Sequence, residues 1–304
     1  MSDRRDGDLL LTSYRYLRIG MLGVVLALAV SIGIERSAAD CWQPAVSSYF
    51  HTPVRAIFVG GLMAIAVSLI VIKGDGRWED IFFNFAGIMA PIVAVIPTDA
   101  FGADCAPSAG GASVRTDGEW TPLLQASIDN NVTALLITGF AGLIVAAVLA
   151  MFVNGSVRAP AIVGAIEQRL GLLVTFGLLV ALSAAYRWWD NFSDRAHGWS
   201  AVAMFVLLGA GIGANAYQRW RRTTRQRYCR IYTLIVVGMA ASAIVIGLLL
   251  PDPWEHRILV LEAVEIAWFA GFWIVQTYEL WNEPRLPDAD IARTPTPAPL
   301  PAGV

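Results

Sequence analysis

Residues 131–153 read NVTALLITGFAGLIVAAVLAMFV, and none of these side chains carries a charge. A helix needs about 20 mainly apolar residues to cross about 30 Å of hydrocarbon, so this stretch predicts a membrane-spanning helix. Seven further stretches of similar composition lie near residues 19–35, 54–72, 81–98, 170–187, 200–217, 231–250 and 258–280. We therefore predict an all-α fold, a polytopic transmembrane bundle of about eight helices.

The overall composition agrees with a membrane protein. Of the 304 residues 56% are hydrophobic and 15% are charged, and the mean hydropathy is +0.57, which is too apolar for a soluble domain of this size. The bundle is expected to span residues 19–281, after a solvated tail at 1–18. Residues 99–129 form the longest expected connection, and the Pro- and Ala-rich residues 282–304 are expected to be a disordered tail.

The basic residues indicate how the helices are oriented. If the N-terminus is cytoplasmic, sixteen basic residues fall inside: Arg4, Arg5, Arg15, Arg18, Lys73, Arg77, Arg158, Arg169, Arg219, Arg221, Arg222, Arg225, Arg227, Arg230, Arg285 and Arg293. Six fall outside: Arg36, Arg55, Arg115, Arg187, Arg195 and Arg257. This bias predicts that both termini are cytoplasmic. We expect a multi-pass protein of a bacterial plasma (inner) membrane, because Lys73 is the only lysine, as a GC-rich genome would produce.

The same orientation sorts the three cysteines. Cys41 and Cys105 fall in the first two external connections, whereas Cys229 lies at the cytoplasmic start of a helix. The outer side of a plasma membrane is oxidising and the cytoplasm is reducing. We therefore predict a disulfide between Cys41 and Cys105, which would tether residues 99–129 as an external cap, and a free thiol at Cys229.

Ionisable residues gather toward the predicted outer face. Glu262 and Glu265 lie within the last apolar stretch, three residues apart and hence on one helix face, with Phe269, Phe272, Gln276 and Glu279 continuing that face. Ionisable residues at membrane depth are expected to face the bundle interior or a cavity. We take as the candidate polar cluster Glu262, Glu265, Arg55, Arg187, Asn84 and Asp99, with the two arginines as counter-ions.

All three histidines, His51, His197 and His256, precede apolar stretches at the predicted outer face. We consider three functions for the polar residues at this predicted outer face. A structural or accessory role is the one that the sequence favours, with the acids in interhelical pairs. The first alternative is a transporter, or a small-ligand or proton-binding protein, with an outward-facing polar cleft. The second is a metal-dependent enzyme acting on lipid headgroups, in which the three histidines hold Zn²⁺.

The enzyme interpretation has little support, because no HExxH or similar metal-binding spacing occurs, and we predict no cofactor and lean against catalysis. Membrane lipids are the expected partners. A nucleic-acid partner is not expected, because the basic residues are separated by side and form no single patch. Gly209 and Gly213 form a small-xxx-small pair of the kind that brings helices together, which predicts ordinary packing or a homo-oligomer face.

Several short runs resemble one family. SSYFHTPVRAIFVGG at residues 47–61, Lys73-Gly74, NFAG at 84–87 and AVIPT at 94–98 are similar to runs in a family of uncharacterised bacterial multispan membrane proteins, which carry an SxYYxTPxRxxFVGxL run, a KG pair and an NLAG segment ending in PT. The resemblance covers about a sixth of the chain. It implies a fold of about eight membrane helices and a membrane location, and it implies no activity.

Overall fold

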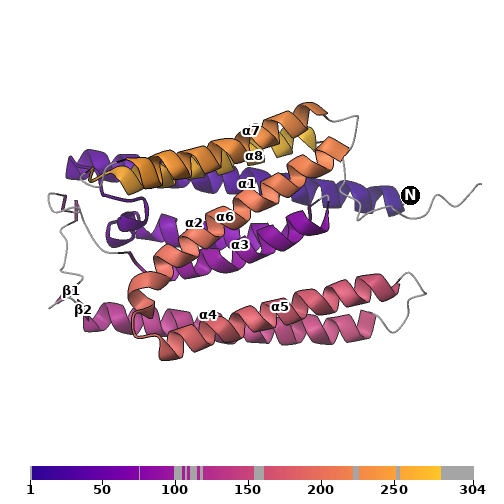
Figure 1. Ribbon diagram of the computed structural model, residues 1–304, viewed down its shortest axis with the longest axis horizontal. Coiled ribbons are helices and arrows are strands. Elements are labelled where there is room, and N and C mark those ends of the chain that lie inside the picture. The colour runs from indigo at the N-terminus through magenta and orange to yellow at the C-terminus, as the bar shows by residue number, and fades with distance from the viewer. Residues whose placement is uncertain are drawn as a thin grey trace, which may run out of the picture.

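The computed structural model describes residues 2–74, 76–98, 105–106, 108–109, 115–116, 119–153, 161–221, 226–250 and 254–281. These residues form an elongated helical bundle with the helices roughly along the long axis (Figure 1). Its α-helices are α1 (Ser2–Ala39), α2 (Arg55–Val71), α3 (Arg77–Val95), α4 (Pro122–Val153), α5 (Ala161–Trp188), α6 (Phe192–Arg221), α7 (Gln226–Ile244) and α8 (Arg257–Glu279). Shorter elements are the 3₁₀ helix η1 (Ser47–His51), the strands β1 (Arg115–Thr116) and β2 (Glu119–Trp120), and the π-helical turn η4 (Val245–Leu249).

Within the described residues, seven helices contain apolar segments long enough to cross a membrane, and α2, with 17 residues, is a shorter apolar helix. The prediction of an all-helical protein with apolar helices of membrane-spanning length is therefore confirmed. By the length and composition of these helices, the chain is a multi-pass membrane protein.

Two helices extend beyond their predicted limits. α1 begins at Ser2, so the expected tail is helical from that residue on, because the stretch contains no proline and a single glycine, Gly7. α4 begins at Pro122, so the connection at 99–129 ends earlier than expected; proline suits the first turn of a helix because the N–H it lacks has no helical partner there. The expected disordered tail at 282–304 lies outside the described residues.

α3 lies at the centre of the bundle and packs against α2 and α6 (Figure 1). Small residues make these close approaches possible. A Cβ atom on Gly87 would lie 2.9 Å from the carbonyl oxygen of Ala66, and one on Gly211 would lie 2.5 Å from the ring of Phe83. The hairpin of α4 and α5 lies to one side of the other six helices and meets them mainly through α3 and α6.

The connection after α1 is tethered to the segment around Cys105. The sulfur atoms of Cys41 and Cys105 lie 2.04 Å apart, at disulfide distance, and the side-chain amide of Gln43 donates to the carbonyl oxygen of Cys105 at 3.3 Å. Glu35, at the end of α1, accepts hydrogen bonds from the backbone N–H and the hydroxyl of Ser108. These contacts hold the segment around Cys105 against the end of α1, and Cys229 is a free thiol.

Candidate functional site

One face of α8 carries several polar residues toward the bundle interior. Its residues are spaced alternately three and four apart, which places them on a single stripe of an α-helix. We call this stripe the α8 seam, and it consists of Glu262, Glu265, Phe269, Phe272, Gln276 and Glu279. At about 1.5 Å per residue, Glu262 and Glu279 lie about 25 Å apart along the helix. The seam therefore has acids near both ends of the helix and aromatic rings between them.

The two acids at the start of the seam bind different elements. Glu262 accepts hydrogen bonds from the backbone N–H and the hydroxyl of Ser47 in η1, both at 3.1 Å, whereas Glu265 accepts one from the hydroxyl of Ser242 in α7 at 2.7 Å. In the described part of the chain, no hydrogen bond joins the carboxyl group of Glu262 to that of Glu265. A separation of three residues turns the second side chain about 60° around the helix axis, so the two acids meet different neighbours. The two carboxyl groups therefore have separate hydrogen-bond partners on different elements.

η1 presents Ser47 to Glu262 from a buried position. Thr52 closes the turn, because its hydroxyl donates to the carbonyl oxygen of Tyr49 and accepts from the N–H of Val54. The ring of Tyr49 is fully buried, and this burial raises the pKa of its phenol. Ser47 therefore donates its hydrogen bonds to α8 from a buried, hydrogen-bonded turn.

Between Glu265 and Glu279 along α8, the bundle interior is filled by aromatic side chains. Phe272 has ring contacts with Phe83 of α3 at 5.7 Å, with Tyr232 of α7 at 5.4 Å and with Trp273 at 5.2 Å between centroids. Phe269 also meets Trp273 at 6.2 Å. Phe83, Phe272 and Trp273 are buried almost completely. We call Phe83, Phe269, Phe272 and Trp273 the aromatic layer, and it separates the acids at the two ends of the seam.

An ion pair lies on the other side of the aromatic layer. The guanidinium Nε of Arg219 in α6 lies 2.6 Å from Oε1 of Glu279, and both side chains are fully buried. The hydroxyl of Tyr232 donates to the second carboxylate oxygen at 2.5 Å. The network thus joins the ends of α6 and α8 to α7. Buried charges are tolerated only where they are paired and hydrogen-bonded, as they are here.

A second carboxylate lies at the same end of the bundle. Glu79 of α3 is fully buried, and its Oε1 accepts from the amides of Asn215 in α6 at 2.8 Å and Gln276 in α8 at 3.1 Å. The amide oxygens of Asn215 and Gln276 are buried without a hydrogen-bond partner among the described residues. We call Glu79, Asn215, Arg219, Tyr232, Gln276 and Glu279 the inner network. It connects four helices through charged and amide groups.

The structure does not bring the remaining members of the predicted polar cluster together with the acids. Arg55 is exposed, and its guanidinium lies over the ring of Phe50 at 4.2 Å. Arg187 is exposed at the end of α5. Among the described residues neither arginine forms an ion pair with Glu262 or Glu265, because Arg55 stacks on Phe50 and Arg187 is exposed to solvent. Asp99 lies outside the described residues.

Asn84 faces a different space from the acids. It is half-buried on α3 and lines a cavity of about 520 Å³ between α3 and the α4–α5 hairpin, together with Pro91, Gly139 and Thr175. Its amide oxygen is buried and has no hydrogen-bond partner among the described residues. Asn84 was counted in the predicted polar cluster with Glu262 and Glu265, and the structure places it instead beside the α4–α5 hairpin.

The three histidines do not converge on a metal site. His51 Nε2 lies 3.0 Å from the carbonyl oxygen of Thr98, and His197 Nδ1 lies 2.6 Å from that of Ile96, so both contact the chain just after α3. His256 instead stands at the start of α8. Among the described residues, no group of three or more His, Cys, Asp and Glu side chains could hold a metal ion.

Sequence reasoning missed the inner network as a site. Glu79 and Arg219 lie within three residues of a helix end, where charged side chains usually reach water, and so their burial was not expected. Glu279 was expected on the α8 face but without its partner Arg219. A signal was available nonetheless. Asn215 and Gln276 are amides within apolar stretches, and the spacing of the α8 seam continues through Gln276 to Glu279. Amides in such stretches need partners in the bundle interior.

No protein-family model, curated protein or solved structure matches the chain.

Proposed function

We propose that this protein is a proton-coupled membrane transporter of a small cation. The observation that carries the proposal is the α8 seam, in which acids near both ends of one helix contact different neighbouring helices and are separated by the aromatic layer. Ionisable residues inside a membrane bundle commonly mark ion or proton pathways. In this proposal Glu262 and Glu265 take up a proton or a cation, and Glu79 and Glu279 lie on its route to the other side.

The distances favour a carrier over an open channel. Glu265 and Gln276 are separated by about 16 Å along α8, which is too far for a direct proton transfer across the aromatic layer. Passage therefore requires the helices around Phe272 to move. The ion pair between Arg219 and Glu279, sealed by Tyr232, closes the inner end in the described conformation, and its release would open that end.

The orientation belongs to the same proposal. We place both termini in the cytoplasm of a bacterium and the Glu262 end of α8 outside, which is supported by the excess of arginine on the opposite side. Cys229 lies on the proposed cytoplasmic side. A membrane-impermeant maleimide should therefore label Cys229 in lysed cells and not in intact ones; equal labelling of both would contradict the orientation.

Proton flux into liposomes tests the transport function. The purified protein is reconstituted with a pH-sensitive dye inside, and Na⁺, K⁺ and cyclopentylammonium are supplied in turn. We expect flux above that of empty liposomes with at least one cation, and a loss of about tenfold or more in Glu265→Gln. Asp129→Asn is the matched control, because Asp129 of α4 binds Gln125 and Tyr186 and lies outside the seam.

Two outcomes would overturn the proposal in favour of the structural role. The first is a wild-type flux equal to that of empty liposomes with all three cations. The second is a Glu265→Gln flux equal to that of the wild type.

A further inference from the structure

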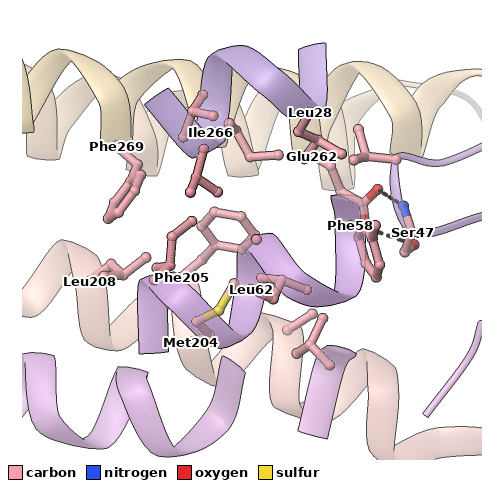
Figure 2. A pocket seen from close by; sticks show the side chains of 17 residues that line it. Leu28, Ser47, Phe58, Leu62, Met204, Phe205, Leu208, Glu262, Ile266 and Phe269 are labelled. Atoms are coloured by element: carbon pink, nitrogen blue, oxygen red, sulfur yellow. Dashed lines mark hydrogen bonds between the residues drawn. The ribbon is translucent and has the colours of Figure 1, made fainter. Parts of the chain in front are cut away.

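Glu262 lies at the edge of a small, partly open cavity in the bundle. Five helices and η1 surround a cavity of about 70 Å³, and Figure 2 shows its side chains, with Phe58, Phe205 and Phe269 among them. Of the residues that line the cavity, only Glu262 and Ser47 carry oxygen in their side chains. The cavity therefore combines an apolar wall with a single carboxyl group.

The carboxyl group has hydrogen-bond donors but no cation beside it. Within the described residues Glu262 forms no ion pair; it accepts hydrogen bonds from the backbone N–H and the hydroxyl of Ser47 (Figure 2), and the backbone N–H of Val46 also points to it. A carboxylate accepts about four hydrogen bonds in total, so it keeps acceptor capacity beyond these. A charge that is buried without a counter-charge is costly, so the group favours an added positive partner. That partner is either a proton or a cation that enters the cavity.

The side chains that line the cavity favour one kind of cation over others. Metal ions such as Ca²⁺ and Mg²⁺ require about six oxygen ligands, and the lining supplies only the oxygens of Glu262 and Ser47 among its side chains. An alkylammonium ion instead needs few hydrogen-bond acceptors and gains from apolar and aromatic contact. A water molecule needs about 10–15 Å³ of such volume, so the cavity has room for about five or six non-hydrogen atoms.

We propose that this cavity binds a small hydrophobic primary amine, held as its ammonium ion by Glu262 and competing there with a proton. The proposal rests on the proposed transport function in making the amine the cargo. Exchange of the amine for a proton on one carboxyl group would couple the two fluxes, because the site carries one positive partner at a time.

Binding is measured without any gradient, by calorimetry on the purified full-length protein in nanodiscs at neutral pH. The probes are cyclopentylamine and its neutral analogue cyclopentanol. We expect the amine to bind about tenfold or more tightly than the alcohol, and Glu262→Gln to remove this preference. Retained cyclopentanol binding shows that the variant is folded. Ala201→Leu, which fills the cavity, should abolish binding of both probes, and Asp129→Asn should change neither.

Equal affinity for the two probes in the wild type would overturn the proposal, as would an undiminished amine preference in Glu262→Gln. Transport is tested separately by uptake of cyclopentylamine into liposomes. Binding with no uptake would contradict the transport function and leave the amine site standing, whereas cation-driven proton flux with no amine binding would do the reverse.

Discussion

Arg219 of α6 and Glu279 of α8 form an ion pair whose side chains are both fully buried, with 2.6 Å between Nε and Oε1. The pair lies at the end of the bundle where α6 and α8 both finish, and Tyr232 adds a hydrogen bond from α7. Three helices are thus joined at one point by charge. The consequence is that this end of the bundle depends on a few polar contacts, while the centre depends on aromatic packing.

Removing the carboxylate of the pair should destabilise the protein strongly. Glu279→Gln takes away the charge that faces Arg219 in a buried position, and we expect a loss of about 3–5 kcal/mol in the free energy of unfolding. Reversible SDS unfolding in bicelles measures it. The double variant Arg219→Met with Glu279→Met should recover most of the loss, because apolar replacements of buried pairs are often close to neutral. A loss below about 1 kcal/mol in the single variant would indicate a solvated pair.

The hydroxyl of Tyr232 should matter more than that of its neighbour. Tyr232→Phe removes a hydrogen bond to a carboxylate, and we expect a cost of about 1.5–3 kcal/mol in the same unfolding assay. Tyr228→Phe is the matched control, since the Tyr228 hydroxyl accepts from Arg227 in a partly exposed contact, and it should cost about 1 kcal/mol or less. Equal costs would mean that Tyr232 contributes packing alone.

Thiol labelling should reveal one reactive cysteine in the wild type. After denaturation without reductant, Cys229 is expected to react and the bonded Cys41 and Cys105 are not. In Cys41→Ser both Cys105 and Cys229 should react. The bond closes a loop over a sequence separation of 64 residues, so its loss should lower stability by about 4 kcal/mol. Labelling of all three cysteines in the wild type would contradict the pairing.

Two glycines of α6 should respond differently to the same enlargement. Gly211→Leu must push against Phe83, and overpacking of this kind costs about 1–3 kcal/mol. A Cβ on Gly213 meets nothing within 4 Å, so Gly213→Leu should cost the monomer less stability than Gly211→Leu. If Gly209 and Gly213 form a homo-oligomer face, Gly213→Leu should lower the cross-linked dimer fraction in liposomes. An unchanged dimer fraction would exclude that face.

The local amino-acid composition was sufficient to predict the fold class. Apolar length alone predicts a membrane helix, because the bilayer requires every spanning backbone group to be satisfied within the helix. Helix limits were less predictable. Nothing in the charges of residues 2–18 prevents a helix, so α1 extends further than its apolar part. The close approach of α6 to α3 occurs at Gly211 and not at Gly209 or Gly213, since the direction in which a glycine faces depends on the rotation of the whole helix.

The candidate site was predictable only in part. Glu262 and Glu265 stood out because acids within an apolar stretch are rare, but their partners Ser47 and Ser242 lie 215 and 23 residues away in the chain. The expected counter-ions Arg55 and Arg187 lie at the rim, because a flexible arginine near a helix end can reach solvent. Glu79 was overlooked for the converse reason, since neighbouring helices cover a helix end that sequence reasoning assumes to be exposed to water. Glu279 was recognised as part of the α8 face, but its pairing with Arg219 was not.

The sequence by itself determined a chain of apolar helices, the cysteines that can pair and the acids that lie at membrane depth, because these follow from local composition and from the bilayer as solvent. Only the tertiary structure decided which groups meet: the ion pair of Arg219 with Glu279, the separate partners of Glu262 and Glu265, and the cavity beside Ser47. The physical reason is that helix rotation and depth are set by the packing of many side chains at once, and a turn of about 60° is enough to give an acid a different neighbour.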